Sequence, residues 1–111
     1  MHEYSIAYDI VVTSRKAALE NNAQYISSIY VDFGELAIIN PEQVEFLFNT
    51  IVEDEPLFKN TKLVCTIVPP LTRCSCGYEG NEIFVCPKCG QLPVLEKGRE
   101  VVVTKIEVEA E

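Results

Sequence analysis

Basic residues are scarce in this sequence. Nine Lys and Arg stand against 17 Asp and Glu, which gives a formal net charge of −8 and a pI near 4.6. Proteins that bind nucleic acids draw much of their affinity from clustered Lys and Arg, and the sequence offers no basic stripe of that kind. The composition therefore argues against DNA or RNA as a partner.

Long apolar runs are lacking as well. No segment approaches the ~20 apolar residues that cross a bilayer, and the N-terminus has no basic stretch followed by an apolar core. These absences predict a soluble, cytoplasmic protein with no membrane partner. At 111 residues and 48% hydrophobic content, the chain can form one ordinary domain with a core of its own.

Histidine occurs only once, at His2, whereas cysteine occurs five times. Four of the cysteines form two tight pairs separated by a short turn, and no histidine lies nearby to compete as a ligand. Two thiolates from each of two turns can surround one ion tetrahedrally, which is the geometry and ligand type that Zn²⁺ prefers. The spacing predicts a structural four-thiolate zinc site at Cys74, Cys76, Cys86 and Cys89.

The two cysteine pairs differ in regularity. In the second pair, Cys86-Pro87-Lys88-Cys89-Gly90, the proline stiffens the turn and the glycine lets backbone N–H groups approach the sulfurs. The first pair, Cys74-Ser75-Cys76, is one residue tighter. Disulfides, an iron–sulfur cluster and thiol redox chemistry are the alternatives. Disulfides are disfavoured because nothing indicates export and cytosolic thiols stay reduced.

Catalysis is not indicated by these residues. Four cysteines leave no open position of the kind that a catalytic zinc ion needs, and no nucleophile–base pair accompanies them. We therefore expect a protein that is not an enzyme. The fifth cysteine, Cys65, lies among apolar neighbours and is interpreted as a small buried hydrophobic residue.

Hydrophobic periodicity predicts two helices and three strands. Apolar residues recur at helical spacing near the N-terminus, and a second helix begins where Asn40 can cap and Pro41 can take the first turn. In the last strand the alternation predicts one face of Val102, Thr104, Ile106 and Val108. The predicted elements are a helix over 3–22, a strand over 25–33, a helix from 40 that ends before Pro56, and strands over 62–68 and 99–109.

Three strands that share a face with two helices predict a small α+β fold. Hinges at Pro69-Pro70 and Pro93–Gly98 bracket the cysteine segment. We therefore expect an α+β domain over residues 1–69 and 98–111 and an inserted zinc-binding module over 70–97. A segment this short usually needs a metal for stability, so the module should lose its order without zinc while the helices and strands persist.

The N-terminus offers a second group of ligands. A lone terminal histidine is usually just solvated. The α-amine of Met1, the amide that joins it to His2, and the imidazole can nevertheless chelate one ion in a nitrogen-rich set suited to Ni²⁺ or Cu²⁺, and Glu3 can add an oxygen. The residues alone leave both interpretations open.

Five segments together resemble a known family. They are Met1-His2-Glu3-Tyr4-Ser5, Phe33-Gly34-Glu35-Leu36, the Asn40-Pro41-Glu42 helix start followed by Phe46 and Phe48, the cysteine module, and Val103-Thr104-Lys105-Ile106-Glu107. This order of segments is similar to the HypA family, the nickel-insertion accessory proteins of nickel–iron hydrogenase maturation.

The resemblance implies a nickel site at Met1, His2 and Glu3 beside the structural zinc site. It also implies a cytosolic role in passing Ni²⁺ to the hydrogenase large subunit together with a maturation GTPase, and some relatives also serve urease. The prediction is therefore a nickel metallochaperone. The alternative is a zinc-ribbon adaptor that mediates protein–protein contacts without nickel. Exchange of the module between chains would give a homodimer, which the sequence neither requires nor excludes.

Three features depart from the family pattern. The Cys74–Cys76 pair is tighter than the usual two-residue gap, and Asn40 stands where some relatives carry an aspartate close to the nickel site. Because the chain has no second histidine, the zinc module cannot supply an imidazole to nickel.

Overall fold

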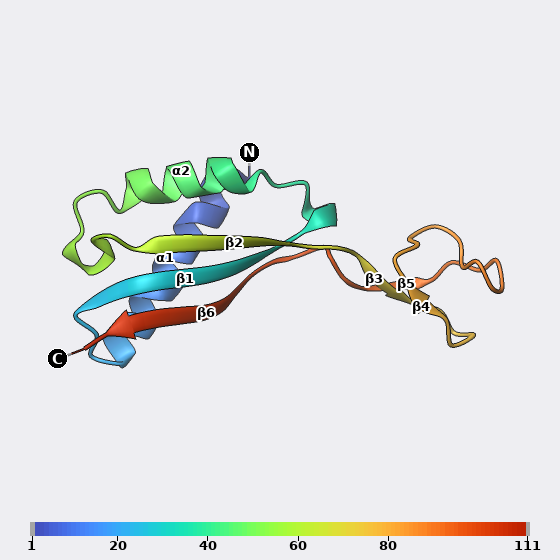
Figure 1. The fold of residues 1–111 in the computed structure, drawn as a ribbon. Coiled ribbons are helices and arrows are strands. Elements are labelled where there is room, and N and C mark those ends of the chain that lie inside the picture. Colours follow the sequence, from blue (N-terminus) through green and yellow to red (C-terminus); the bar gives the residue numbers. More distant parts are fainter. Residues whose placement is uncertain (1, 111) are drawn as a thin grey trace.

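The computed structural model describes residues 2–110 and forms two small sheets at opposite ends of an elongated molecule (Figure 1). In the larger sheet, β1 (Tyr25–Gly34) is central. It pairs in parallel with β2 (Lys62–Val68) and antiparallel with β6 (Val101–Glu109). Two helices, α1 (Glu3–Glu20) and α2 (Pro41–Ile51), pack on one face of this sheet. The predicted α+β fold of two helices on three strands is confirmed.

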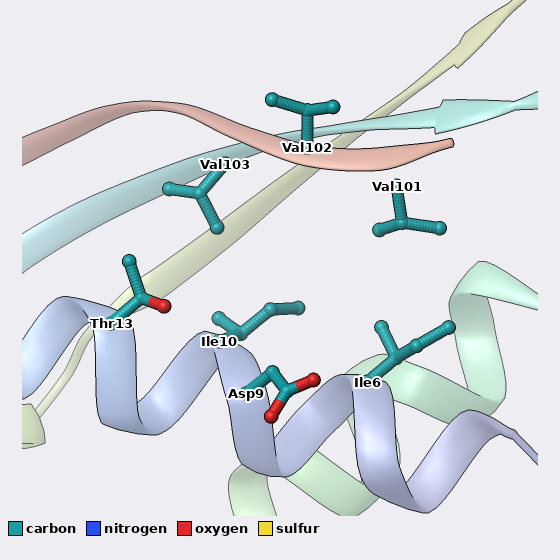
Figure 2. Close-up of a pocket in the computed structure, with 7 residues that line it drawn as sticks. All are labelled: Ile6, Asp9, Ile10, Thr13, Val101, Val102 and Val103. Atoms are coloured by element: carbon teal, nitrogen blue, oxygen red, sulfur yellow. The ribbon is translucent and has the colours of Figure 1, made fainter.

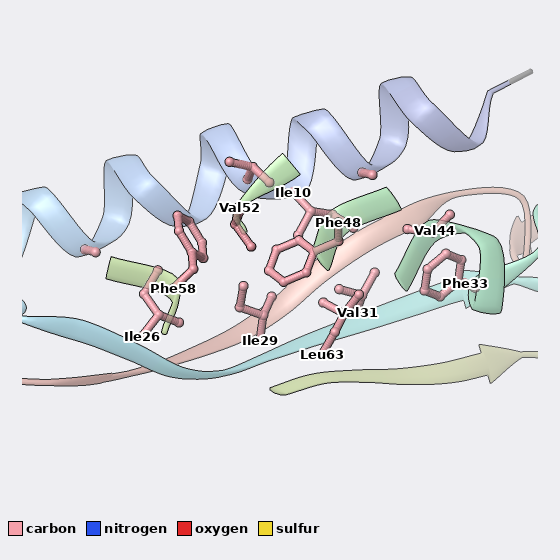
Figure 3. Close-up of a cluster of buried hydrophobic side chains, with 13 residues drawn as sticks. Ile10, Ile26, Ile29, Val31, Phe33, Val44, Phe48, Val52, Phe58 and Leu63 are labelled. Carbon is pink, nitrogen blue, oxygen red and sulfur yellow. The ribbon is translucent and has the colours of Figure 1, made fainter. Parts of the chain in front are cut away.

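The core lies between the helices and the sheet (Figure 3). Successive side chains of a strand point to opposite faces, so Ile29, Val31 and Phe33 of β1 are all buried on the helix side. Phe48 of α2 contacts Phe58 edge to face, with ring centroids 5.8 Å apart. Phe58 belongs to the short 3-10 helix η2 (Pro56–Phe58), which closes the far end of the core.

Local capping explains where the helices begin and end. The Asn40 side-chain oxygen accepts hydrogen bonds from the backbone N–H groups of Glu42 (3.0 Å) and Gln43 (3.3 Å), so the predicted cap of α2 is confirmed. The first helix ends at Glu20, just before the asparagines at 21 and 22 where the predicted helix over 3–22 ends. There the Asn21 side chain donates to the Ala17 carbonyl, and Asn22 adopts a left-handed conformation with φ 53°.

A bulge changes which side chains of the last strand face the helices. Tyr30 pairs with Lys105 and Val31 pairs with Val103, which leaves Thr104 as an extra residue. Because side chains alternate with a period of two, one extra residue moves the following side chains to the opposite face.

The predicted face of this strand is therefore only half right. Ile106 and Val108 pack against the core as expected, whereas Val102 and Thr104 are exposed. Before the bulge, the core-facing residues are instead Val101 and Val103.

The second sheet contains the cysteine segment. Its order is β4-β3-β5, with β3 (Leu71–Arg73) between β4 (Glu79–Gly80) and β5 (Val94–Lys97). Figure 1 shows this sheet beyond the end of β2, and the molecule measures 55 × 28 × 16 Å. The second predicted hinge is wrong over 94–97, because these residues form a strand.

A narrow neck joins the two sheets. The backbone N–H of Leu36, in the 3-10 helix η1 (Glu35–Ala37), donates to the Gly98 carbonyl at 2.7 Å, and the Gly34 N–H donates to the Glu100 carbonyl at 2.8 Å. Gly98 has φ +107°, and a Cβ on it would lie 2.6 Å from the Pro70 Cα. Only glycine fits here, and the predicted hinge residues Pro70 and Gly98 lie against each other.

Candidate metal centre

The four predicted zinc ligands come together in the structure. Their sulfur atoms all lie within 4.8 Å of one another. The closest pairs join the two turns, with Cys74 Sγ 3.3 Å from Cys89 Sγ and Cys76 Sγ 3.6 Å from Cys86 Sγ. A tetrahedral ion with Zn–S bonds of about 2.3 Å places its sulfurs about 3.8 Å apart, so this cluster fits one zinc ion.

The tight first pair still forms a turn that directs both thiols inward. The Gly77 N–H donates to the Cys74 carbonyl at 2.9 Å, and the Cys74 N–H donates to the Tyr78 carbonyl at 2.8 Å. Gly77 has φ +99°, a conformation that residues with a Cβ rarely adopt. The missing residue therefore shortens the turn without removing a ligand.

The second pair closes in the same way. The Gly90 N–H donates to the Cys86 carbonyl and the Cys86 N–H to the Gln91 carbonyl, both at 2.8 Å. Gly90 has φ +76°. Cys86 is buried and Cys89 is exposed, as Cys74 and Cys76 are in the first pair, so each turn contributes one inner and one outer thiol.

The thiols share protons unequally. The backbone N–H of Cys76, followed by the Cys89 thiol, lowers the pKa of Cys74 to about 6. The Gln91 N–H lowers the pKa of Cys89, but the Cys74 thiol, then partial desolvation, then the Cys76 and Cys86 thiols together outweigh it and raise the pKa to about 12. Because a metal takes thiolates as ligands, binding to this cluster must release protons.

The predicted nickel residues lie at the other end of the chain. Met1 lies outside the described residues. His2 is exposed and precedes α1, and its carbonyl accepts hydrogen bonds from the Ser5 hydroxyl at 2.9 Å and from the Ile6 N–H at 3.0 Å. The backbone of His2 is therefore held by the first turn of the helix, while its imidazole stands in solvent.

Glu3 ties the starts of the two helices together. Its carboxylate accepts a hydrogen bond from the backbone N–H of Asn40 at 3.3 Å, and this contact is the main reason that its pKa is lowered. The Asn40 side chain faces its own helix as a cap, so it is the backbone of Asn40 that meets Glu3. Sequence reasoning placed Asn40 near the nickel site but missed this contact, which depends on the packing of α1 against α2.

The two candidate sites are separate. Figure 1 shows the start of α1 beside the start of α2, and the cysteine segment beyond the neck. Among residues 2–110, the four-cysteine cluster is the only group of three or more His, Cys, Asp or Glu side chains close enough together to hold one ion. Cys65 does not join it. This residue packs at the edge of the core and is half-buried rather than buried, and burial, with a smaller effect of Glu45, raises its pKa to about 11.

No helix among the described residues is both long enough and apolar enough to span a membrane.

Known proteins are similar to this chain along nearly its whole length. A family model described as "Hydrogenase/urease nickel incorporation, metallochaperone, hypA" matches residues 1–108. The chain is 40% identical to the hydrogenase maturation factor HypA of Methanocella arvoryzae, over 98% of this chain and 99% of that one. It is 33% identical to the HypA of Methanothermobacter thermautotrophicus, over 98% of each.

Solved structures share the fold. The solution structure of the Ni metallochaperone HypA from Helicobacter pylori superposes with a TM-score of 0.76 over the whole of both chains, at 24% sequence identity. A second solution structure of a HypA protein gives a TM-score of 0.80 at the same identity, over 100% of this chain and 98% of that one.

Proposed function

Because this chain belongs to the HypA family of metallochaperones for nickel incorporation into hydrogenase and urease, we propose that it binds Ni²⁺ at Met1, His2 and Glu3 and delivers it to an immature enzyme. The α-amine of Met1, the first peptide nitrogen and the His2 imidazole supply a planar nitrogen set, and Glu3 supplies oxygen. Nickel is the cargo in this proposal, so the site must both bind and release it.

The exposed start of α1 carries the proposal. The His2 carbonyl accepts a hydrogen bond from the first helical turn, which fixes the backbone. Because His2 is exposed, its imidazole is within reach of both an ion and an approaching protein. The Asn40 N–H holds the Glu3 carboxylate at the same place. The helix dipole opposes a cation here by about 0.3–1 kcal/mol, which a carboxylate and a deprotonated amide can offset. Moderate affinity suits a protein that must release its metal.

We further propose that Cys74, Cys76, Cys86 and Cys89 hold a structural Zn²⁺. When bound, the ion cross-links the two turns of a segment with little core of its own. The four thiols fill the coordination sphere, so this site supports folding rather than catalysis. On this basis residues 70–97 form the zinc-binding module, and residues 1–69 and 98–111 form the nickel-binding domain.

The family also suggests where and with what the protein works. Its role in nickel incorporation favours the immature large subunit of a nickel–iron hydrogenase as acceptor, with urease as a second candidate. We place the protein in the cytoplasm, with a maturation GTPase as a further partner. The net charge of −8 supports protein partners rather than nucleic acid.

Calorimetric titration of Ni²⁺ tests the N-terminal site. The protein with its native terminus should bind one nickel ion. The His2→Ala variant and a protein with one extra residue before Met1 should bind far more weakly, because each disrupts the chelate rings. Zinc content should be equal in all three and serves as the control for folding. Equal nickel affinity in all three proteins would exclude this site.

One observation favours the adaptor alternative. The cysteine segment exposes four large apolar side chains, of which Phe84 is the most exposed at 76% and the others are Val85, Leu92 and Val94. Large exposed apolar patches mark protein-interaction sites, and these four residues lie within one short segment of the chain. If none of the three proteins binds nickel in the titration, contact with other proteins through these apolar residues becomes the leading function.

A further inference from the structure

An open groove runs between α1 and β6 (Figure 2). It encloses about 300 Å³. Ile6 and Ile10 form its helical wall, and Val101 and Val103 face them from the strand. Asp9 and Thr13 lie at its rim. The groove is thus apolar inside, with a carboxylate and a hydroxyl at its mouth.

The strand wall of this groove is an edge of the sheet. Among the described residues β6 pairs only with β1, so the hydrogen-bonding groups on its other side have no strand partner. Such an edge can accept an added strand from another protein, with main-chain hydrogen bonds giving affinity and side-chain pockets giving selectivity. An added strand would direct alternate side chains toward the groove.

The charge at the rim indicates what kind of segment fits. Asp9 is exposed and has no ion-pair partner among the described residues. The chain as a whole carries a charge of −8. A Lys or Arg on the incoming segment could pair with Asp9 while apolar neighbours enter the groove, whereas a second copy of this acidic chain would be repelled.

The groove begins next to the proposed nickel site. The N–H of Ile6, which lines the groove, donates to the carbonyl of His2 at 3.0 Å. A segment bound in the groove would therefore end within one helical turn of the nickel-binding residues. Docking here would bring an acceptor to the metal.

We propose that the groove between α1 and the free edge of β6 is the docking site of the nickel acceptor. It binds an extended segment of the immature hydrogenase large subunit that carries apolar residues and a Lys or Arg, and this segment adds to β6 as a fourth strand. The proposal rests on the proposed function, since it names the surface through which nickel is handed over.

The test measures binding of the purified, nickel-free large subunit precursor from the same organism. Asp9→Lys and Thr13→Arg change exposed rim residues, so both variants should fold. Each should weaken binding about tenfold, the effect of losing roughly 1.4 kcal/mol. Asp54→Lys is the matched control: it makes the same charge change on an exposed residue after α2, outside the groove, and should bind like the unmodified protein.

Amide hydrogen exchange identifies the surface independently. In the complex, the amides of β6 that lack a partner in the free protein should exchange about tenfold more slowly, because an added strand gives them acceptors. Absence of precursor binding, protection confined to the cysteine segment, or equal affinity of the Asp9→Lys and Asp54→Lys proteins would each overturn the proposal. A concentration-dependent dimer of this chain alone, with the same β6 protection, would assign the edge to a second copy instead.

Nickel titration of the same variants separates this proposal from the one on which it rests. Asp9→Lys should bind nickel with unchanged affinity but transfer it to the precursor more slowly. If the unmodified protein binds no nickel, the proposed function is wrong. Unchanged transfer by Asp9→Lys would contradict only the docking site.

Discussion

At the scale of single residues, Ile38 is the clearest case of local strain. It has φ 55° and ψ 49°, a left-handed conformation that β-branched residues rarely adopt, and its side chain is 87% exposed. The surrounding contacts hold it there. The Leu36 N–H is bonded to Gly98 across the neck, and the Asn40 N–H is bonded to Glu3. Ile38 therefore lies between two anchored residues, one bonded to the neck and one bonded to the start of α1.

Replacing this residue should stabilise the protein. Ile38→Asn should raise the free energy of unfolding by about 1 kcal/mol, because asparagine tolerates the left-handed conformation and the exposed isoleucine buries little surface. Ile67→Asn is the control, since Ile67 is also exposed but lies in a regular strand, and that change should be neutral or destabilising. Urea denaturation measures both. A loss of stability in Ile38→Asn would show that this side chain contributes contacts of its own.

At the scale of elements, the start of α2 makes two contributions that can be separated. The Asn40 side chain caps the helix, and its backbone N–H holds Glu3. Asn40→Ala should lower the free energy of unfolding by about 1 kcal/mol through loss of the cap, whereas Asn40→Asp should retain it. Both variants keep the backbone N–H and should therefore keep the contact with Glu3. Thermal denaturation and nickel titration check the two parts, and equal stability of the two variants would contradict the role of the cap.

The elements also show how much can be predicted from sequence. Both helices, the three long strands and the four-cysteine cluster depend on signals close together in the chain: periodicity, a capping asparagine, and ligands spaced within tight turns. The bulge at Thr104 could not be predicted, because it arises from how β6 pairs with β1. The contact between Glu3 and Asn40 and the groove beside β6 were missed for the same reason, since each depends on elements brought together only by folding.

At the scale of the whole molecule, loss of zinc should unfold only the part of the chain beyond the neck. The larger sheet and its helices share one apolar core, whereas the second sheet has short strands and few buried residues beyond Thr72, Cys74 and Cys86. Removing zinc with a chelator should therefore free the amides of residues 71–97 to exchange while those of β1, β2 and the helices stay protected. Hydrogen exchange measured by NMR checks this, and loss of protection throughout the chain would show that the two parts fold as one unit.

We propose that one small chain holds two metals for different purposes: zinc at the cysteines for structure, and nickel at the N-terminus for delivery. Elemental analysis of the purified protein after equilibration with nickel and zinc, with His2→Ala measured in parallel, distinguishes the two sites. The unmodified protein should hold one zinc and one nickel per chain, and His2→Ala should hold one zinc and no nickel. Nickel retained in full by His2→Ala, or nickel lost only when the cysteines are replaced, would contradict it.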